Sequence, residues 1–143
     1  MNNKEKFIPM PSYQMRKNAI NKLLCYEKTK NKNLLEIGYG AGDVFSLYKK
    51  FKLNIFGYDI SEAAFIYASK NLKNAAITLM TEKDEIKKRK YDYVVACEVL
   101  EHIEDDIEAL REWVSYLTDD GKLIISVPAH QSIWGASDDW AGH

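Results

Sequence analysis

Hydrophobic and polar positions along the 143-residue chain follow two different periodicities. Apolar residues three or four positions apart predict helices, and short, continuously apolar runs predict buried strands. The helical pattern predicts helices over residues 12–26, 43–51, 61–72 and 105–117. The apolar runs predict strands over residues 34–37, 54–58, 76–80, 93–97 and 122–127. This alternation predicts an α/β fold, with a doubly wound, mostly parallel five-stranded sheet and helices on both faces.

Polar residues and turn formers mark the ends of several predicted elements. Ser12 and Ser61 are expected to cap the helices that follow them, and Asp120 with Gly121 is expected to form the turn into the last strand. The densely charged run at 83–90 fits a solvated loop or helix better than a binding patch.

Three alternating glycines, Gly38, Gly40 and Gly42, follow the first predicted strand, and Glu36 precedes them. Glycine lets the backbone bend sharply and lets a ligand approach closely, and the next helix offers free N–H groups. Asp59 follows the second strand, about 20 residues beyond the first glycine, which is where a carboxylate can accept hydrogen bonds from ribose hydroxyls. A helix-capping role for Asp59 is the alternative. Parallel strands with this order of motifs predict a ligand site at the carboxyl edge of the sheet.

Four segments together resemble the class I S-adenosylmethionine-dependent methyltransferases, which have a Rossmann-like fold. They are residues 36–42 (EIGYGAG), 57–61 (GYDIS), 91–102 (YDYVVACEVLEH) and 121–128 (GKLIISVP). The resemblance spans residues 34–143 and implies S-adenosyl-L-methionine as cofactor. A nicotinamide-dependent oxidoreductase also fits the glycines and Asp59, but it does not explain Glu36, the segment at 91–102 or the loop after the fifth strand.

The resemblance implies roles for individual residues. Gly38 and Gly40 border the methionine part of the cofactor, Asp59 holds the ribose, Ile60 packs on the adenine, and Asp84 accepts its amino group. The full cofactor-binding set implied is Glu36, Gly38, Tyr39, Gly40, Gly42, Asp59, Ile60, Asp84, Cys97 and Glu98. Arg16 is a further candidate for the cofactor carboxylate, with an exposed surface arginine as the favoured alternative.

Methyl transfer from a sulfonium needs mainly alignment and exclusion of water, with a base only for a poorly acidic acceptor. His130 is the candidate base because histidine titrates near neutrality; a surface histidine is the alternative. No metal is expected. Glu98, Glu101 and His102 form a minor candidate set, since positions i, i+3 and i+4 share one face of a helix. The aromatic segment after Val127 is expected to cover the site or bind the acceptor.

Composition narrows the class of protein further. With 20 basic and 21 acidic residues the chain is nearly neutral, so no nucleic-acid or membrane partner is expected. No apolar run is long enough to span a bilayer, and we expect a cytoplasmic protein. Cys25 and Cys97 are expected to be reduced core residues.

The length predicts a single methyltransferase domain over residues 1–143, with a tail at 1–11 and a leading helix at 12–26. The family usually continues with an antiparallel strand pair, so we expect a domain truncated at its C-terminus. The expected function is methyl transfer from S-adenosylmethionine to a small-molecule acceptor, or binding of the cofactor or its demethylated product without turnover. The oligomeric state is not predicted.

Overall fold

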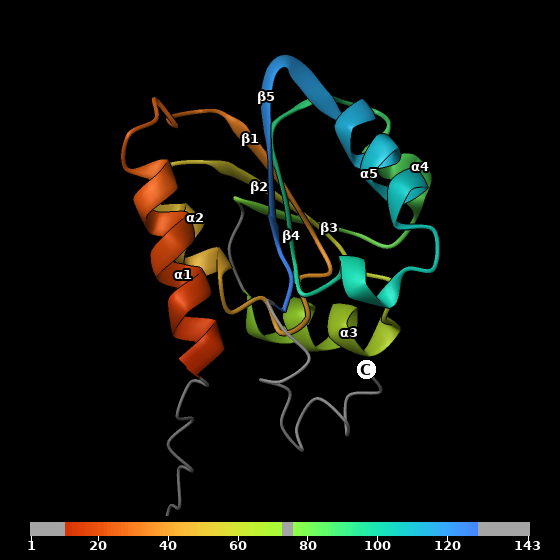
Figure 1. Ribbon diagram of the computed structural model, residues 1–143. Helices are drawn as coiled ribbons and strands as arrows, with labels where there is room; N and C mark the ends of the chain where they lie inside the picture. The colour runs from red at the N-terminus through yellow and green to blue at the C-terminus, as the bar shows by residue number, and fades with distance from the viewer. Residues whose placement is uncertain (1–10, 73–75, 129–143) are drawn as a thin grey trace, which may run out of the picture.

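The computed structural model describes residues 11–72 and 76–128, which form a five-stranded, all-parallel sheet (Figure 1). The strands lie in the order β3-β2-β1-β4-β5. Their bounds are β1 Asn33–Ile37, β2 Asn54–Tyr58, β3 Ile77–Met80, β4 Tyr91–Cys97 and β5 Leu117–Ser126. The predicted fold class is confirmed. Strand order reverses between β1 and β4, which places a ligand crevice at their carboxyl ends.

Helices cover both faces of the sheet. Their bounds are α1 Pro11–Leu24, α2 Phe45–Lys50, α3 Glu62–Asn71, α4 Lys83–Ile86 and α5 Asp106–Ser115, with a 3₁₀ turn, η1, at Leu100–His102. Figure 1 shows α1 and α2 on one side of the sheet and α4 and α5 on the other. Ala68 of α3 packs into the same core as α1 and α2. Two cores result, one on each face, because alternate residues of the strands point to opposite sides.

Local capping explains where several helices begin. The Ser61 hydroxyl accepts a hydrogen bond from the Ala64 amide, as predicted, and Asp105 caps α5 through the Glu108 amide. The prediction that Ser12 caps the first helix is wrong. α1 already begins at Pro11, a residue suited to the first helical position because it has no N–H to satisfy.

Only some of the apolar residues of α1 are buried. Ile20 and Leu24 are buried, but Met15 and Leu23 are exposed. Cys25 lies just past the end of α1 and is exposed, so the expectation that it is a core residue is wrong. Only one stripe of this short helix contacts the sheet, which leaves the remaining apolar positions in solvent.

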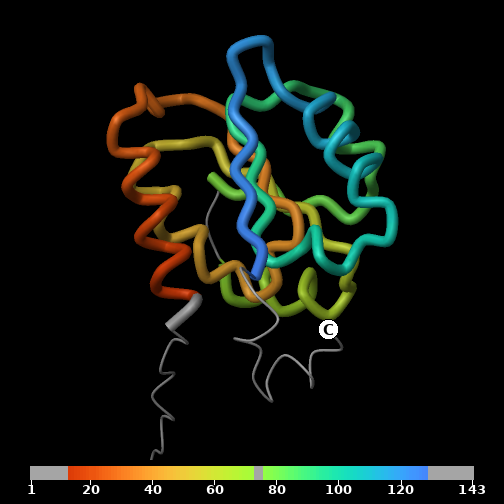
Figure 2. The backbone as a smooth tube through the Cα atoms, in the orientation of Figure 1, coloured from red at the N-terminus to blue at the C-terminus, as the bar shows by residue number. Residues whose placement is uncertain are grey.

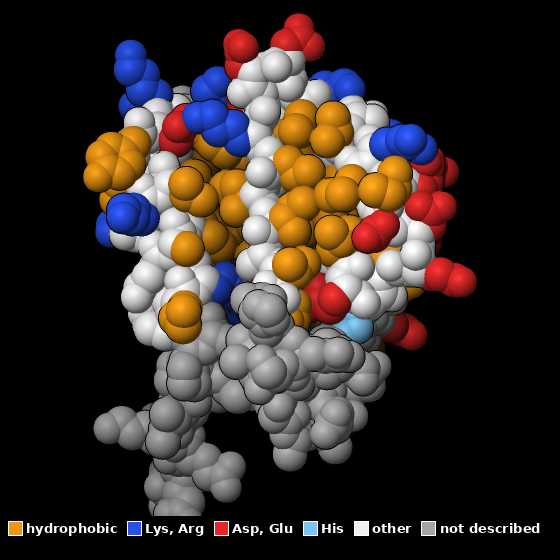
Figure 3. Space-filling model, viewed as in Figure 1, with side chains coloured by type: hydrophobic (Ala, Val, Ile, Leu, Met, Phe, Trp, Pro, Cys, Tyr) orange, Lys and Arg blue, Asp and Glu red, His pale blue; other side chains and the backbone are white. Residues whose placement is uncertain are grey.

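β5 begins earlier than predicted and contains the expected turn residues. Tyr91 pairs with Leu117 and Tyr93 pairs with Lys122, so the register shifts between these two pairs. Gly121 therefore lies within an irregular part of the strand. In Figure 3, hydrophobic side chains lie on both sides of the β5 backbone. Leu123 and Ile125 of β5 are only partly buried and pack against the core on the side of α5.

The turns that carry the motifs meet at one edge of the sheet, as the backbone tube of Figure 2 shows for the ends of β1, β4 and β5. The Gly38 amide donates to the Tyr58 carbonyl (2.8 Å), and the Glu98 amide donates to the Ser126 carbonyl (2.9 Å). These bonds join the residues that follow β1 and β4 to neighbouring strands. Within the described ranges, no helix has the length and apolar character needed to cross a membrane.

Candidate functional site

The glycine turn after β1 adopts a conformation that explains its composition. Gly38, Gly40 and Gly42 all have φ between 53° and 75°, the left-handed region that other residues rarely enter. A Cβ on Gly38 would lie 2.4 Å from a methyl group of Val99, so this position is also closed sterically. A Cβ on Gly40 would meet nothing within 4 Å. The turn is therefore packed at Gly38 and open at Gly40, where its bare backbone can receive a ligand.

Asp59 connects the end of β2 to this turn. One of its carboxylate oxygens accepts from the Gly40 amide and the other from the Ser61 amide, each at 2.8 Å. Both contacts fit the alternative of a capping or turn aspartate, and the ribose-binding role of Asp59 stays a prediction. Each carboxylate oxygen has a second lone pair, so the group can accept further hydrogen bonds from a ligand.

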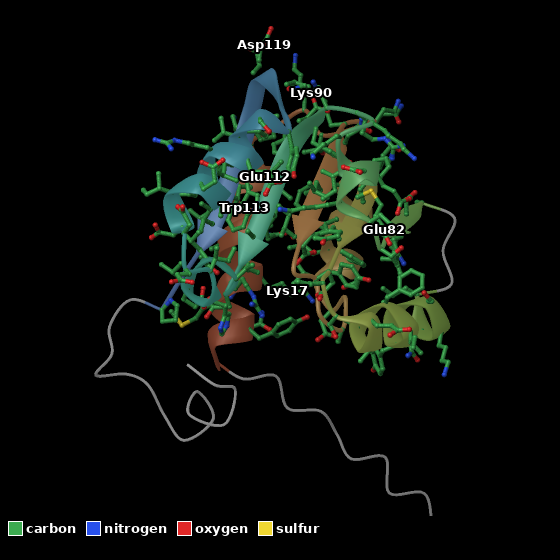
Figure 4. The ribbon with its side chains drawn as sticks, turned by 90° about the vertical axis from the view of Figure 1, so that its right-hand side faces the viewer. Lys17, Glu82, Lys90, Glu112, Trp113 and Asp119 are labelled. Carbon is green, nitrogen blue, oxygen red and sulfur yellow. The ribbon has the colours of Figure 1, made fainter. Side chains whose placement is uncertain are left out.

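A cavity of about 460 Å³ opens beside Gly38, Asp59 and Ile60. It continues between α4 and α5 along the sheet to Trp113 and Tyr116, and we call it the α4–α5 cavity. Ile60 lines its mouth with 91% of its surface exposed. An isoleucine left in solvent at the tip of a strand offers a flat apolar ring a surface to pack on. Figure 4 faces this side of the molecule and labels Glu112 and Trp113 of α5.

Glu36 is buried behind the glycine turn on the opposite face of the sheet from the cavity. Burial raises the pKa of its carboxyl group to about 8, and the positive charge of Arg16 limits that rise. The Oε2 atom of Glu36 and the Nε atom of Arg16 are both buried without a hydrogen-bond partner. Arg16 is only partly exposed, so the surface alternative for this residue does not describe its environment. Both side chains retain polar atoms that a ligand could satisfy.

Tyr39 has its backbone in the turn but its side chain in the core. Its ring packs against Phe45 with 5.5 Å between centroids, and only 5% of the residue is exposed. Burial and the nearby Asp59 charge raise the pKa of Tyr39 to about 12. Contact with a ligand at this position would therefore involve the backbone.

The end of β4 contributes Cys97 and Glu98 to the same edge. Cys97 is buried, as predicted, and burial raises the pKa of its thiol. Glu98 has a φ of 57°, which is uncommon for a residue with a side chain. Its carboxylate accepts a hydrogen bond from the Ser126 hydroxyl at 2.9 Å. Paired backbone and side-chain bonds to the end of β5 hold Glu98 in this strained conformation.

The minor metal-binding set is not assembled. Among the described residues, no three His, Cys, Asp or Glu side chains are arranged to hold a metal ion. Glu101 and His102 belong to the 3₁₀ turn η1, whereas Glu98 precedes it and bonds to Ser126. The helical face on which the three side chains would converge does not form. Both carboxylate oxygens of Glu101 are buried without a hydrogen-bond partner.

Asp84 and His130 are the two predicted site residues that remain. The side chain of Asp84 is 90% exposed and pairs with Lys87 at 3.4 Å, next to Lys83 at the cavity rim. Its contact with an adenine stays a prediction. His130 and the aromatic segment after Val127 lie outside the described residues, except for Pro128.

The glycine turn lies at the carboxyl edge of a parallel sheet with strand order 3-2-1-4-5, and the Asp59 carboxylate after the neighbouring strand holds it. Comparison of the sequence with known protein families is consistent with this arrangement. The family described as "methyltransferase domain" matches residues 12–143. The chain belongs to this family.

Solved structures share the fold of this methyltransferase domain. The plantazolicin methyltransferase BpumL, in complex with a desmethylPZN analog and SAH, superposes with a TM-score of 0.65 at 21% identity, covering 85% of this chain and 49% of its own. Magnesium protoporphyrin IX methyltransferase from Synechocystis PCC 6803, with bound SAM, has a TM-score of 0.67 and 22% sequence identity, and the match covers 80% of this chain and 58% of that protein. The N-methyltransferase NodS from Bradyrhizobium japonicum WM9, with SAH, has a TM-score of 0.67 and 20% sequence identity, and the match covers 87% of this chain and 66% of that protein.

The methyltransferase domain described here is shorter than these proteins. It spans about half of the length of the first solved structures that it matches. A search of curated proteins found no significant sequence match.

Sequence reasoning missed the inner part of the α4–α5 cavity in this methyltransferase domain. Lys83 of α4 forms an ion pair with Glu112 of α5 at 2.6 Å, and Trp113 and Tyr116 line the space behind it. These residues belong to no motif. Their only sequence signal is the helical spacing of α5, which predicts a buried face without indicating a cavity.

Proposed function

We propose that the chain binds S-adenosylmethionine at the carboxyl edge of its sheet and transfers the methyl group to a small molecule. The observation that carries the proposal is the open backbone at Gly40, fixed by Asp59 at the mouth of a cavity. Membership of the methyltransferase domain family supports the reaction type. The Synechocystis structure contains SAM, and NodS and BpumL contain SAH.

The residues at the cavity mouth suit an adenosine. Asp59 would accept hydrogen bonds from the ribose hydroxyls through its remaining lone pairs. Ile60 would pack against the adenine ring, because its side chain is exposed and lines the cavity. Asp84 would receive the adenine amino group after a side-chain rotation away from Lys87.

The residues behind the glycine turn suit a charged amino-acid group. A carboxylate near Gly38 and Gly40 would lie beside the open backbone of the turn and pair with the Arg16 guanidinium, whose Nε atom has no hydrogen-bond partner. An ammonium group would be compensated by Glu36, whose Oε2 atom has no partner. Cys97 and Glu98, at the end of β4, would close this part of the site.

Bound S-adenosylmethionine supplies an electrophilic methyl group on a positively charged sulfur, so no covalent bond to the protein is required. The contribution of this chain is to hold the cofactor in one orientation and to exclude water from the reacting atoms. His130 remains the predicted base for an acceptor that has to lose a proton. No divalent metal is assigned a role.

A small-molecule acceptor is supported by the nature of the structural neighbours. One is coclaurine N-methyltransferase bound to N-methylheliamine, and another acts on magnesium protoporphyrin IX. At identities of 16% and 22%, these neighbours support the class of acceptor without identifying it.

Calorimetric titration with S-adenosylmethionine, S-adenosylhomocysteine and NAD tests the cofactor assignment. We expect saturable binding of the two adenosyl ligands and no binding of NAD. Binding of NAD alone would contradict the proposal. Production of S-adenosylhomocysteine in the presence of a panel of small acceptors then separates an enzyme from a protein that only retains the cofactor.

A further inference from the structure

The α4–α5 cavity extends well beyond the part that an adenosine would occupy. Its lining includes Asp105 at the N-terminal end of α5 and Tyr116 just past the C-terminal end of the same helix. At a rise of about 1.5 Å per residue, the distance along the helix axis from Asp105 to Tyr116 is about 16 Å. The ribose contact at Asp59 and the ring contact at Ile60 lie at the carboxyl edge of the sheet, and only the adenine amino group would reach α4, so the inner part of the cavity towards Trp113 and Tyr116 is left over.

The shortness of the connection between β3 and β4 explains this space. α4 is a single turn of four residues, Lys83–Ile86, held by a capping box between Glu82 and Glu85. It covers less of the sheet than the helices of the opposite face. Phe56 and Tyr58 are accordingly only partly buried, although they belong to the second strand from the edge.

The inner walls of the cavity are apolar. Ile86 comes from α4 and Trp113 from α5, and Ala109, one turn before Trp113 on the same helix, has no side chain beyond Cβ. Such walls favour an aromatic or aliphatic group over a polar one, because a polar group would lose its hydrogen bonds to water there.

One polar atom is available at the inner end. The Tyr116 hydroxyl is buried without a hydrogen-bond partner, and Tyr116 is only 3% exposed. Burial, and after it the interaction with the neighbouring Glu112 carboxylate, raises the pKa of Tyr116. The distance and angles between the two side chains do not meet the geometry of a hydrogen bond. Glu112 is instead held by Lys83. A ligand atom that accepts a hydrogen bond can therefore pair with Tyr116 without displacing an existing bond.

We propose that this inner cavity is a second subsite, which takes an apolar aromatic group carried on the adenine amino group of an adenosyl ligand. The inference rests on the proposed function, since it needs the adenine at Ile60 with its amino group towards α4. The amino group then faces the gap between Lys83 and Glu112, whose side chains are 53% and 26% exposed. A pair this exposed contributes little to stability and can separate to admit a substituent.

The test compares S-adenosylhomocysteine with N6-benzyl-S-adenosylhomocysteine by calorimetry on the full chain. We expect the benzyl compound to bind about tenfold more tightly, because a buried aromatic ring gains at least that much from leaving water. Ala109→Leu narrows the subsite and should remove this advantage while leaving S-adenosylhomocysteine affinity within twofold. Val114→Leu enlarges an exposed residue of the same helix and serves as the matched control.

A variant in the opposite direction covers the case in which Ala109→Leu does not fold. Trp113→Phe enlarges the inner end and should increase the preference for a bulkier N6-(naphthylmethyl) compound over N6-benzyl by about threefold or more.

The outcomes distinguish the subsite from the proposed function. If S-adenosylhomocysteine binds and the benzyl compound binds tenfold more weakly, the subsite is overturned and the cofactor assignment stands. A benzyl advantage that is unchanged in both Ala109→Leu and Trp113→Phe would place the group elsewhere and also overturn the subsite. If neither compound binds, the proposed function fails and the subsite fails with it.

Discussion

The two faces of the sheet differ in how completely helices cover them. On one face α1, α2 and α3 pack over a core that contains the fully buried Phe45 and Tyr48. On the other face the four-residue α4 and α5 leave a cavity of about 460 Å³ beside the glycine turn. The well-covered face holds Glu36 and the turn in place, while the thinly covered face provides room for a ligand. One face of the sheet is therefore tightly packed, and the other face is open to a ligand.

Two matched isoleucines test the difference in packing, which should give the largest effect on stability. Ile55 of β2 and Ile86 of α4 are each 1% exposed, but only Ile86 lines the cavity. We expect Ile55→Ala to lower the free energy of unfolding by about 4 kcal/mol and Ile86→Ala by about 2 kcal/mol. Alanine also suits a helix better than a strand, a difference of under about 1 kcal/mol. Urea denaturation measures both. Equal losses would mean that the two faces are packed alike.

A pair of aspartates tests whether the open face is the binding face. Asp59 and Asp92 both accept hydrogen bonds from backbone amides, but only Asp59 lines the cavity. We expect Asp59→Ala to weaken S-adenosylhomocysteine binding about 100-fold, because the two hydrogen bonds from the ribose hydroxyls to the Asp59 carboxylate would be lost. Asp92→Ala should leave this affinity unchanged. Calorimetry provides the comparison, and similar affinities for the two variants would contradict the site.

The pH dependence of stability tests the closed side of the turn, with the smallest expected effect. Burial raises the pKa of Glu36 from 4.5 to about 8, so the folded state retains a proton that the unfolded state releases above about pH 4.5. The free energy of unfolding should therefore fall as pH rises from 4.5 to 8. Glu36→Gln, which carries no charge, should lose this dependence and be more stable at pH 8 by about 1–3 kcal/mol.

Thermal melting between pH 5 and pH 9 measures that change. Glu62→Gln is the control, because Glu62 is exposed in the first turn of α3 and should show the wild-type pH profile. A parallel pH dependence in wild type and Glu36→Gln would show that Glu36 is ionised in the folded protein.

Much of this arrangement was predictable because it depends on local sequence. The order of strands and helices follows from apolar periodicity, and Ser61 begins α3 because its hydroxyl reaches an amide three residues away. The glycine turn was also predictable, since other residues rarely adopt the left-handed backbone that Gly38 and Gly40 have. The errors arose at element ends. Ser12 follows the start of α1, and Cys25 lies in solvent after it, because burial depends on where neighbouring strands happen to end.

The sequence by itself determined an alternating α/β chain, the positive-φ glycine turn and the position of Asp59 at the end of β2, because each is set by residues close together in the chain. Only the tertiary structure decided that Glu98 bonds to Ser126 instead of joining Glu101 and His102, and that a space remains between α4 and α5. These features depend on contacts between segments distant in sequence and on how far a four-residue helix can cover a sheet. The pattern of neighbouring residues in the sequence does not predict such contacts.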